Sequence, residues 1–172
     1  MHFLRTAPLL DALSRGTVSA EERAMYLLAS FVVFNLIYYS GLAASSAPLW
    51  SPASFIEAAA IILVNVLGVV KTFDASGGKS NSDYVAEFTC LYVPVSITTY
   101  LGVWGVYWLL RVGFQESLVE LSESNLQFAI NLGNIGADFF VLLTFLANVL
   151  ALAITYTRIN YLLVRVQQVK LQ

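Results

Sequence analysis

Residues 128–156 read FAINLGNIGADFFVLLTFLANVLALAITY, an apolar run that contains one charged residue, Asp138. The apolar pattern continues to about Tyr156 without a proline to break a helix. A helix needs roughly 20 apolar residues to cross the hydrocarbon core of a bilayer. The stretch therefore predicts a membrane-spanning helix.

Three more apolar blocks precede this run, at about residues 25–44, 55–73 and 84–110. The chain is 58% hydrophobic and only 12% charged, with a mean hydropathy of +0.73. Soluble domains are roughly 45–50% apolar and about 25% charged, and no stretch is left over here for a soluble core. We therefore predict an all-α membrane protein in which residues 1–172 form one domain, a bundle of four transmembrane helices in a lipid bilayer.

Local signals mark where the helices begin, bend and turn. Ser19 with Glu22 three residues later is typical of a capping box at a helix start. Residues 74–83, with the Gly77-Gly78 pair, predict a polar turn, and Pro94 predicts a kink in the third span. Residues 115–127, with glutamates at helical spacing, predict a short separate helix at the membrane interface.

The basic residues predict the orientation of the spans. Lys and Arg concentrate in short cytoplasmic segments of membrane proteins, and in a four-span arrangement only Arg111 lies opposite the others. Both termini are therefore expected in the cytoplasm, with residues 1–16 as an amphipathic segment on the membrane surface. The basic residues that share one side are Arg5, Arg15, Arg23, Lys71, Lys79, Arg158, Arg165 and Lys170.

One polar stripe falls inside the predicted fourth span. Asn131, Asn134 and Asp138 occur at i, i+3 and i+7, so they share one helix face. A charge inside the hydrocarbon is a candidate functional residue. The stripe either lines a path for ions or protons or forms an interhelical hydrogen-bond cluster, in which Asp138 pairs with Arg111. Glu87, near the inner start of the third span, is expected to pair with Lys71 or Arg158.

Small residues at four-residue spacing predict close helix packing. They serve either the bundle itself or an oligomer, and the pattern alone leaves both open. One row is Ala129, Gly133 and Ala137, a second is Ala147, Ala151 and Thr155, and Gly102 with Gly105 forms another surface in the third span.

The last helix is expected to continue past the inner boundary as a cytoplasmic extension, residues 157–172. Its apolar positions form one stripe that needs a surface to cover it. That surface is either lipid or a partner, so the extension is a candidate docking helix for a cytosolic protein or for further copies of the chain. The candidate docking residues are Ile159, Leu162, Leu163, Arg165, Val166 and Val169.

Several classes of function are excluded by composition. The chain has one histidine, His2, and one cysteine, Cys90, so His and Cys metal clusters, Cys-x-x-Cys pairs and His-dependent nucleophile triads are not available. Gly78-Lys79-Ser80 lacks the first glycine of a phosphate-binding loop. A net charge of −2 gives no reason to expect direct contact with nucleic acid. We expect no enzyme activity, no metal and no cofactor.

The stretch from Val70 to Val103 carries a resemblance to a known family. A basic, polar turn leads into DYVAEFTCLYVPV, residues 83–95. Together with chain size and span count, this stretch resembles the small four-span membrane subunit of the Kiwa anti-phage defence system. The resemblance covers about a fifth of the chain and implies a homo-oligomeric sensor of the bacterial inner membrane that recruits a cytosolic DNA-binding effector.

The leading hypothesis is a non-enzymatic membrane sensor or scaffold that oligomerises and recruits a cytosolic protein partner, in anti-phage defence if the resemblance holds. One alternative is a small ion or proton channel or transporter subunit that uses the Asn131, Asn134, Asp138 face. Another is an accessory subunit of a larger membrane complex.

Overall fold

The chain folds entirely into helices in the part that the structure describes. The computed structural model describes the backbone of residues 6–44 and 52–170 and, within them, all side chains except those of residues 35–44, 52–54, 126, 129, 137 and 138. The elements are α1 (Thr6–Ser14), α2 (Ala20–Ala44), α3 (Pro52–Ala75), the short 3-10 helix η1 (Gly78–Ser80), α4 (Tyr84–Ser124) and α5 (Leu126–Lys170).

Among the described residues, three helices are long and apolar enough to cross a membrane: α3 from Phe55, α4, and α5 from Ile130. They confirm apolar membrane-capable helices at three of the four predicted positions. The first predicted span, residues 25–44, coincides with α2, but the side chains of its second half lie outside the described residues.

The predicted start of α2 is confirmed in atomic detail. The backbone N–H of Glu22 donates to Ser19 Oγ at 3.2 Å, and the backbone N–H of Ser19 donates to Glu22 Oε2 at 3.3 Å. This reciprocal pair is a capping box, and it satisfies two of the N–H groups that a helix start leaves open.

The predicted break after residue 110 is wrong. α4 runs without interruption for 41 residues, so the segment expected as a separate interfacial helix is the continuation of the third span. The chain turns at Asn125, whose Oδ1 accepts the backbone N–H of Phe128 at 3.1 Å and caps the start of α5. The predicted break depended on the polar residues after Arg111, but a change in polarity does not end a helix unless glycine, proline or a cap also interrupts its backbone.

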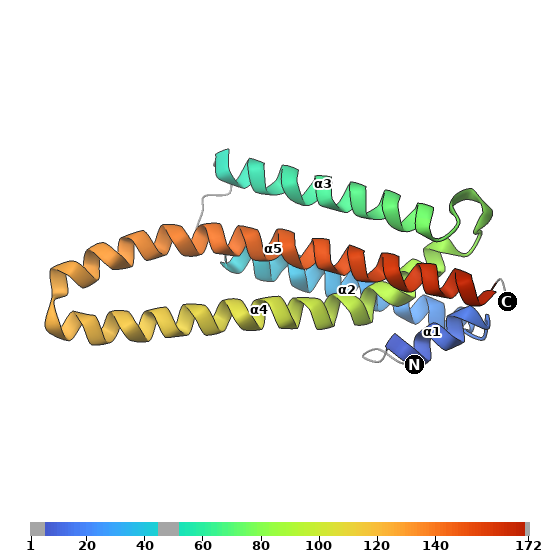
Figure 1. The fold of residues 1–172 in the computed structure, drawn as a ribbon, viewed down its shortest axis with the longest axis horizontal. Coiled ribbons are helices and arrows are strands. Elements are labelled where there is room, and N and C mark those ends of the chain that lie inside the picture. Colours follow the sequence, from blue (N-terminus) through green and yellow to red (C-terminus); the bar gives the residue numbers. More distant parts are fainter. Residues whose placement is uncertain (1–5, 45–51, 171–172) are drawn as a thin grey trace.

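Figure 1 shows α4 and α5 side by side as one long hairpin, with α2 and α3 lying along only part of its length. The two marked chain ends lie at the same end of the molecule, opposite the turn between α4 and α5. We call the end with the chain termini the base, and the part of the hairpin formed by residues 108–147 the hairpin tip.

Pro94 is buried inside α4, and the Thr98 hydroxyl donates to its carbonyl at 2.9 Å.

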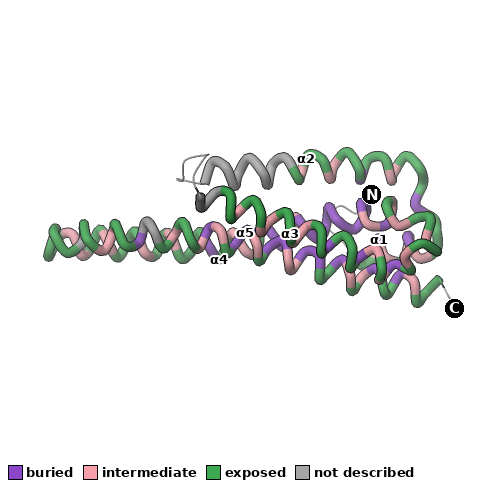
Figure 2. Tube along the Cα trace, turned by 90° about the horizontal axis from the view of Figure 1, so that it is seen from above, coloured by how far each residue is buried: buried purple, intermediate pink, exposed green. Residues whose placement is uncertain are grey.

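Most buried side chains gather at the base (Figure 2). There Leu9 and Leu13 of α1, 2% and 4% exposed, pack in one cluster with Leu91 of α4. α1 therefore covers protein with these residues, and the position of residues 1–16 on the membrane surface stays a prediction. An apolar helix face is buried wherever a matching protein surface lies closer than the membrane.

The predicted docking stripe of the cytoplasmic extension is part of the same core. Ile159, Leu163 and Val166 are fully buried in the cluster, and Leu162 packs against it. The prediction that an outside surface must cover these residues is wrong, because α1 and the start of α4 cover them. Arg165 and Val169 remain exposed.

Glu87 of α4 ties the end of α5 to the base. Its side chain is only 3% exposed and forms an ion pair with the Lys170 ammonium. Asn81 Nδ2 and Gln167 Nε2 also donate to Glu87 Oε2, at 2.9 and 3.3 Å. The expected pairing with Lys71 or Arg158 is wrong, since α5 extends far enough to bring Lys170 to this carboxylate.

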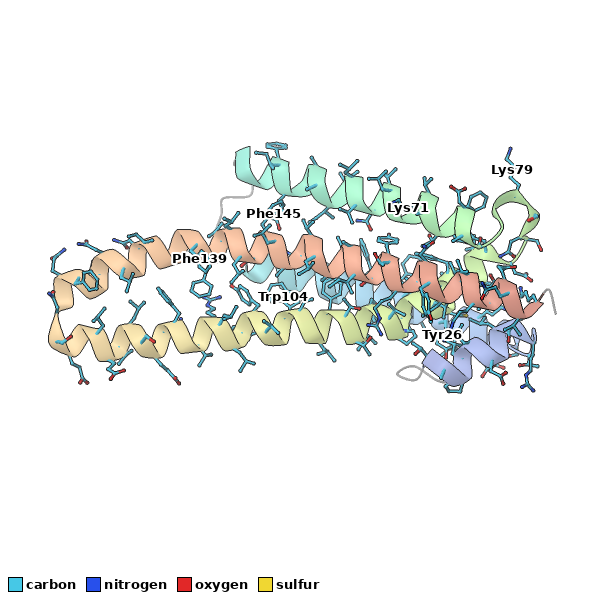
Figure 3. The ribbon with its side chains drawn as sticks, viewed as in Figure 1. Tyr26, Lys71, Lys79, Trp104, Phe139 and Phe145 are labelled. Carbon is cyan, nitrogen blue, oxygen red and sulfur yellow. The ribbon has the colours of Figure 1, made fainter. Side chains whose placement is uncertain are left out.

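Lys170→Met should lower the free energy of unfolding by about 1–3 kcal/mol, because it leaves a buried carboxylate without its cation. Thermal unfolding in detergent, followed by circular dichroism, measures the change. Lys79→Met is the matched control, since Lys79 is exposed and points away from the helices at the turn after α3 (Figure 3). Equal stability of the two variants would contradict the role assigned to the Glu87 pair.

Candidate functional site

Two hydrogen bonds fix the position of α3 along the length of α5. Asn148 Nδ2 donates to Glu57 Oε1 at 3.3 Å, and Tyr156 Oη donates to Asn65 Oδ1 at 2.8 Å. Both pairs are separated by 91 residues, so the two helices run parallel in constant register. α3 from Phe55 to Ala75 is about 31 Å long at 1.5 Å per residue, close to the thickness of a hydrocarbon core.

The hairpin tip extends beyond a bilayer that is fitted to α3. Because Asn148 is level with the start of α3, the part of α5 that precedes it continues for about 33 Å farther. α4 accompanies it, since Thr144 Oγ1 donates to Tyr107 Oη at 3.0 Å. In the tip, α4 carries Glu116, Glu120 and Glu123, and all three are exposed. Three exposed carboxylates are compatible with water and costly in lipid.

The predicted polar cluster does not form inside the bundle among the described residues. Asn131 and Asn134 are exposed and belong to the hairpin tip, beyond the level of α3. Arg111 donates instead to Tyr107 Oη at 3.3 Å and lies 5.5 Å from the ring centroid of Trp108. The side chain of Asp138 lies outside the described residues. Neither asparagine faces the interior of one copy, so neither lines a path through it.

The predicted packing residues divide into two groups. A Cβ on Gly133 would lie 3.8 Å from Leu118, so this glycine packs against α4, whereas Gly102 and Gly105 meet nothing within 4 Å. The side chains of Ala129 and Ala137 lie outside the described residues. Ala147, Ala151 and Thr155 are buried, as expected if that row serves the bundle.

The closest helix contacts involve two glycines that the sequence analysis did not single out. A Cβ on Gly136 would lie 2.3 Å from the ring of Phe114, and one on Gly68 would lie 2.3 Å from Cγ of Tyr156. Gly136 belongs to no four-residue row, so spacing did not mark it, whereas Gly68 begins the row Gly68, Thr72 and Ser76, which the sequence analysis did not single out. Each lies opposite an aromatic ring that only a residue without a side chain can accommodate.

A cavity of about 310 Å³ lies where α2, α3, α4 and α5 meet. Five of the eight lining side chains are aromatic, five carry a hydroxyl or amide group, and none is charged. Such a surface suits an apolar chain better than an ionic substrate. The lining residues are Ser30, Phe31, Phe34, Asn65, Phe88, Thr89, Tyr92 and Tyr156.

The exposed surface of α5 in the hairpin tip carries a row of large apolar side chains. Its residues recur at spacings of seven, four, three and four, which places them on one helix face. In the 91-residue register Leu146 is level with Phe55 of α3, whereas the other four residues come before that level. Most of this apolar row therefore faces outward beyond a bilayer fitted to α3. We call this row the outer α5 stripe: Phe128 (53% exposed), Ile135 (67%), Phe139 (57%), Leu142 (54%) and Leu146 (50%).

Sequence reasoning missed the outer α5 stripe because the same residues were assigned to a membrane span, where lipid would cover them. The available signal was the run of glutamates in residues 115–127, which favours water around this part of α4, the other helix of the hairpin. Once the hairpin register is known, the apolar stripe and the glutamates are found in the same tip.

Gly68→Ala should lower the free energy of unfolding by about 1–3 kcal/mol, because the new methyl group overlaps Tyr156 and strains its bond to Asn65. Gly102→Ala is the matched control, since its Cβ meets nothing within 4 Å, and it should change stability by less than about 0.5 kcal/mol. Denaturant unfolding in mixed micelles measures both. An equally small effect of the two changes would count against the close approach of α3 and α5.

Comparisons of this chain with protein-family models, with curated proteins and with solved structures find no match. The exposed surfaces of the helices are therefore the basis for assigning a function.

Proposed function

We propose that the chain is a non-enzymatic membrane scaffold or sensor whose copies associate through the outer α5 stripe. The observation that carries the proposal is the exposure of five large apolar residues on the hairpin tip, four of which lie beyond the level of α3. Water-exposed apolar rows of this kind mark protein interaction sites. A second copy of the chain offers a surface of the same shape and spacing.

The spacing of the stripe favours helix-to-helix association. Ile135, Phe139, Leu142 and Leu146 follow one another at four, three and four residues, the repeat by which α-helices pack as a coiled coil. The heptad position between Phe128 and Ile135 is Leu132, so the seam stays apolar there. Asn131 is exposed beside this row, at its polar edge.

The proposed topology has four spans, with α2 as the first. An even number of spans returns the chain to its starting side, which agrees with the two chain ends at the same end of the molecule (Figure 1). The base carries Arg15, Lys79 and Arg165, all exposed, and Arg23, whose Nη1 lies 3.6 Å from Asp83 Oδ1. Basic residues favour the cytoplasmic side, so the base is proposed to face the cytoplasm and the hairpin tip the opposite compartment.

The base offers a smaller surface to a cytosolic partner than the sequence predicts. With Ile159, Leu163 and Val166 in the core, the accessible part consists of the turn around Lys79 and the exposed side chains of Arg165 and Val169. The resemblance of residues 70–103 to the Kiwa subunit supports a recruiting role here, in the inner membrane of a bacterium and in defence against phage. An assembly formed at the tip would array these surfaces side by side.

The association is tested with Ile135→Glu and Leu142→Glu in the full chain. A charge in an apolar helix seam is left unpaired and desolvated, so each variant should weaken self-association at least roughly ten-fold. Size-exclusion chromatography with light scattering in mild detergent, over a range of protein concentrations, gives the oligomeric mass.

Val85→Glu is the matched control, because Val85 is 68% exposed on α4 but lies at the base. It should leave the oligomer intact. A wild-type chain that stays monomeric at every concentration would contradict self-association and favour an accessory subunit of another complex. Oligomers that survive both charges in the stripe would place the interface elsewhere.

A further inference from the structure

Arg158 of α5 is a cation held by neutral groups. Its Nη1 donates to the hydroxyl oxygens of Thr98 and Thr99 on α4, at 3.0 and 2.9 Å. Among the described residues no carboxylate lies within ion-pair distance of it. A guanidinium presents five N–H donors in a planar fork, and here the Nε and Nη2 side of that fork has no acceptor in the described part of the chain. The side chain is also exposed on the helix surface.

The depth of Arg158 follows from the register of α3 and α5. With the 91-residue offset, Arg158 is level with Leu67, one helical turn before Lys71. One turn is about 5.4 Å of rise, so Arg158 lies on the membrane side of the lysine that ends the apolar run of α3. With the core fitted to α3, the backbone of Arg158 lies inside the inner edge of the acyl chains, where an unpaired charge is costly unless an anion or water joins it.

A second cation shares this face of α5. Tyr161 and Arg165 follow Arg158 at i+3 and i+7, and both are exposed. The Arg165 guanidinium lies 5.1 Å from the ring centroid of Tyr161, a cation–π contact that keeps its charge beside the helix. Arg165 is level with the end of α3 and Arg158 is about 10 Å deeper, so one charge lies at the edge of the headgroup layer and the other below it.

We infer that Arg158, together with Arg165, binds the phosphate of an anionic phospholipid in the leaflet that faces the base. The free side of the Arg158 fork matches two oxygens of one phosphate, and charge-assisted bidentate bonds of this kind are the strongest that arginine makes. Thr98 and Thr99 hold the fork in place. Arg165 attracts the remaining negative charge of the headgroup, and Tyr161 lies at the interface as tyrosines do.

The depth of the site selects a lipid over a soluble anion. A phosphate in this position must approach along the membrane plane with its acyl chains already in the bilayer, because Arg158 lies below the end of α3. The site rests on the placement of α3 in the membrane and not on association through the hairpin tip. Anionic lipids also concentrate on the side of a membrane that attracts basic segments.

The experiment measures lipid retention by the full-length chain. The protein is purified in detergent and exposed to phosphatidylglycerol or to phosphatidylcholine of the same acyl composition, and native mass spectrometry counts the bound molecules. Both lipids offer the same phosphate oxygens, but the choline ammonium cancels the headgroup charge beside Arg165, so wild type should retain phosphatidylglycerol roughly ten-fold better than phosphatidylcholine. Arg158→Gln and Arg165→Gln should each reduce this preference several-fold.

Arg111→Gln is the matched control, because Arg111 belongs to the hairpin tip, and its preference should equal that of wild type. Arg158→Lys keeps the charge at this depth but loses the planar guanidinium, so this variant should show an intermediate preference for phosphatidylglycerol. If Arg158→Gln does not fold, the result with Arg158→Lys decides the question. The inference is overturned by a wild-type chain without preference, or by a folded Arg158 variant that retains the full preference. Displacement of the lipid by millimolar inorganic phosphate would show a site for a soluble anion instead.

Discussion

The length of a bilayer core is the constraint on which this structure depends. α3 matches that length, whereas α4 and α5 have 41 and 45 residues and are about twice as long. The bonds from Asn148 to Glu57 and from Tyr156 to Asn65 fix where α3 lies along α5. A membrane placed on α3 therefore contains the middle of the hairpin and leaves its turn in water.

This division assigns different physical roles to the two ends of one hairpin. At the base, the fully buried Leu91, Ile159 and Leu163 pack together with α1, and Glu87 with Lys170 closes the end of α5. At the tip, the outer α5 stripe is exposed, and in the proposed placement of the bilayer most of it lies in water. The base is a finished core, while the tip has an apolar face that is stable only when something covers it. The scaffold that we propose, assembled on one side of a membrane and presenting basic surfaces on the other, rests on that asymmetry.

Much of the helical architecture could be predicted from the sequence, because it depends on local signals. The capping box of Ser19 and Glu22 and the apolar runs of α3, α4 and α5 are such signals. The register was not predictable in this way, since a helix that continues past the membrane has no break to mark the boundary. Hydropathy placed residues 84–110 and 128–156 in one bilayer, yet the Tyr107–Thr144 contact shows that they are offset along the hairpin. For this reason Asn131 and Asn134 were assigned to the membrane. The stripe of residues 159–169 was assigned to lipid or a partner, because hydropathy does not reveal that α1, more than 140 residues earlier in the chain, packs against it.

The placement of the bilayer is tested most directly by the depth of a spin label on the hairpin tip. In a Cys90→Ser background, single cysteines at Val119 of the tip and at Ile62 of α3 are labelled in liposomes, and both positions are highly exposed on the helix surface, at 65% and 63%. Collision with a water-soluble nickel chelate and with oxygen reports the medium around each label. We predict that the label at Val119 is accessible to nickel and that the label at Ile62 is accessible to oxygen and shielded from nickel. A label at Val119 that is as deeply buried in lipid as the one at Ile62 would contradict the account.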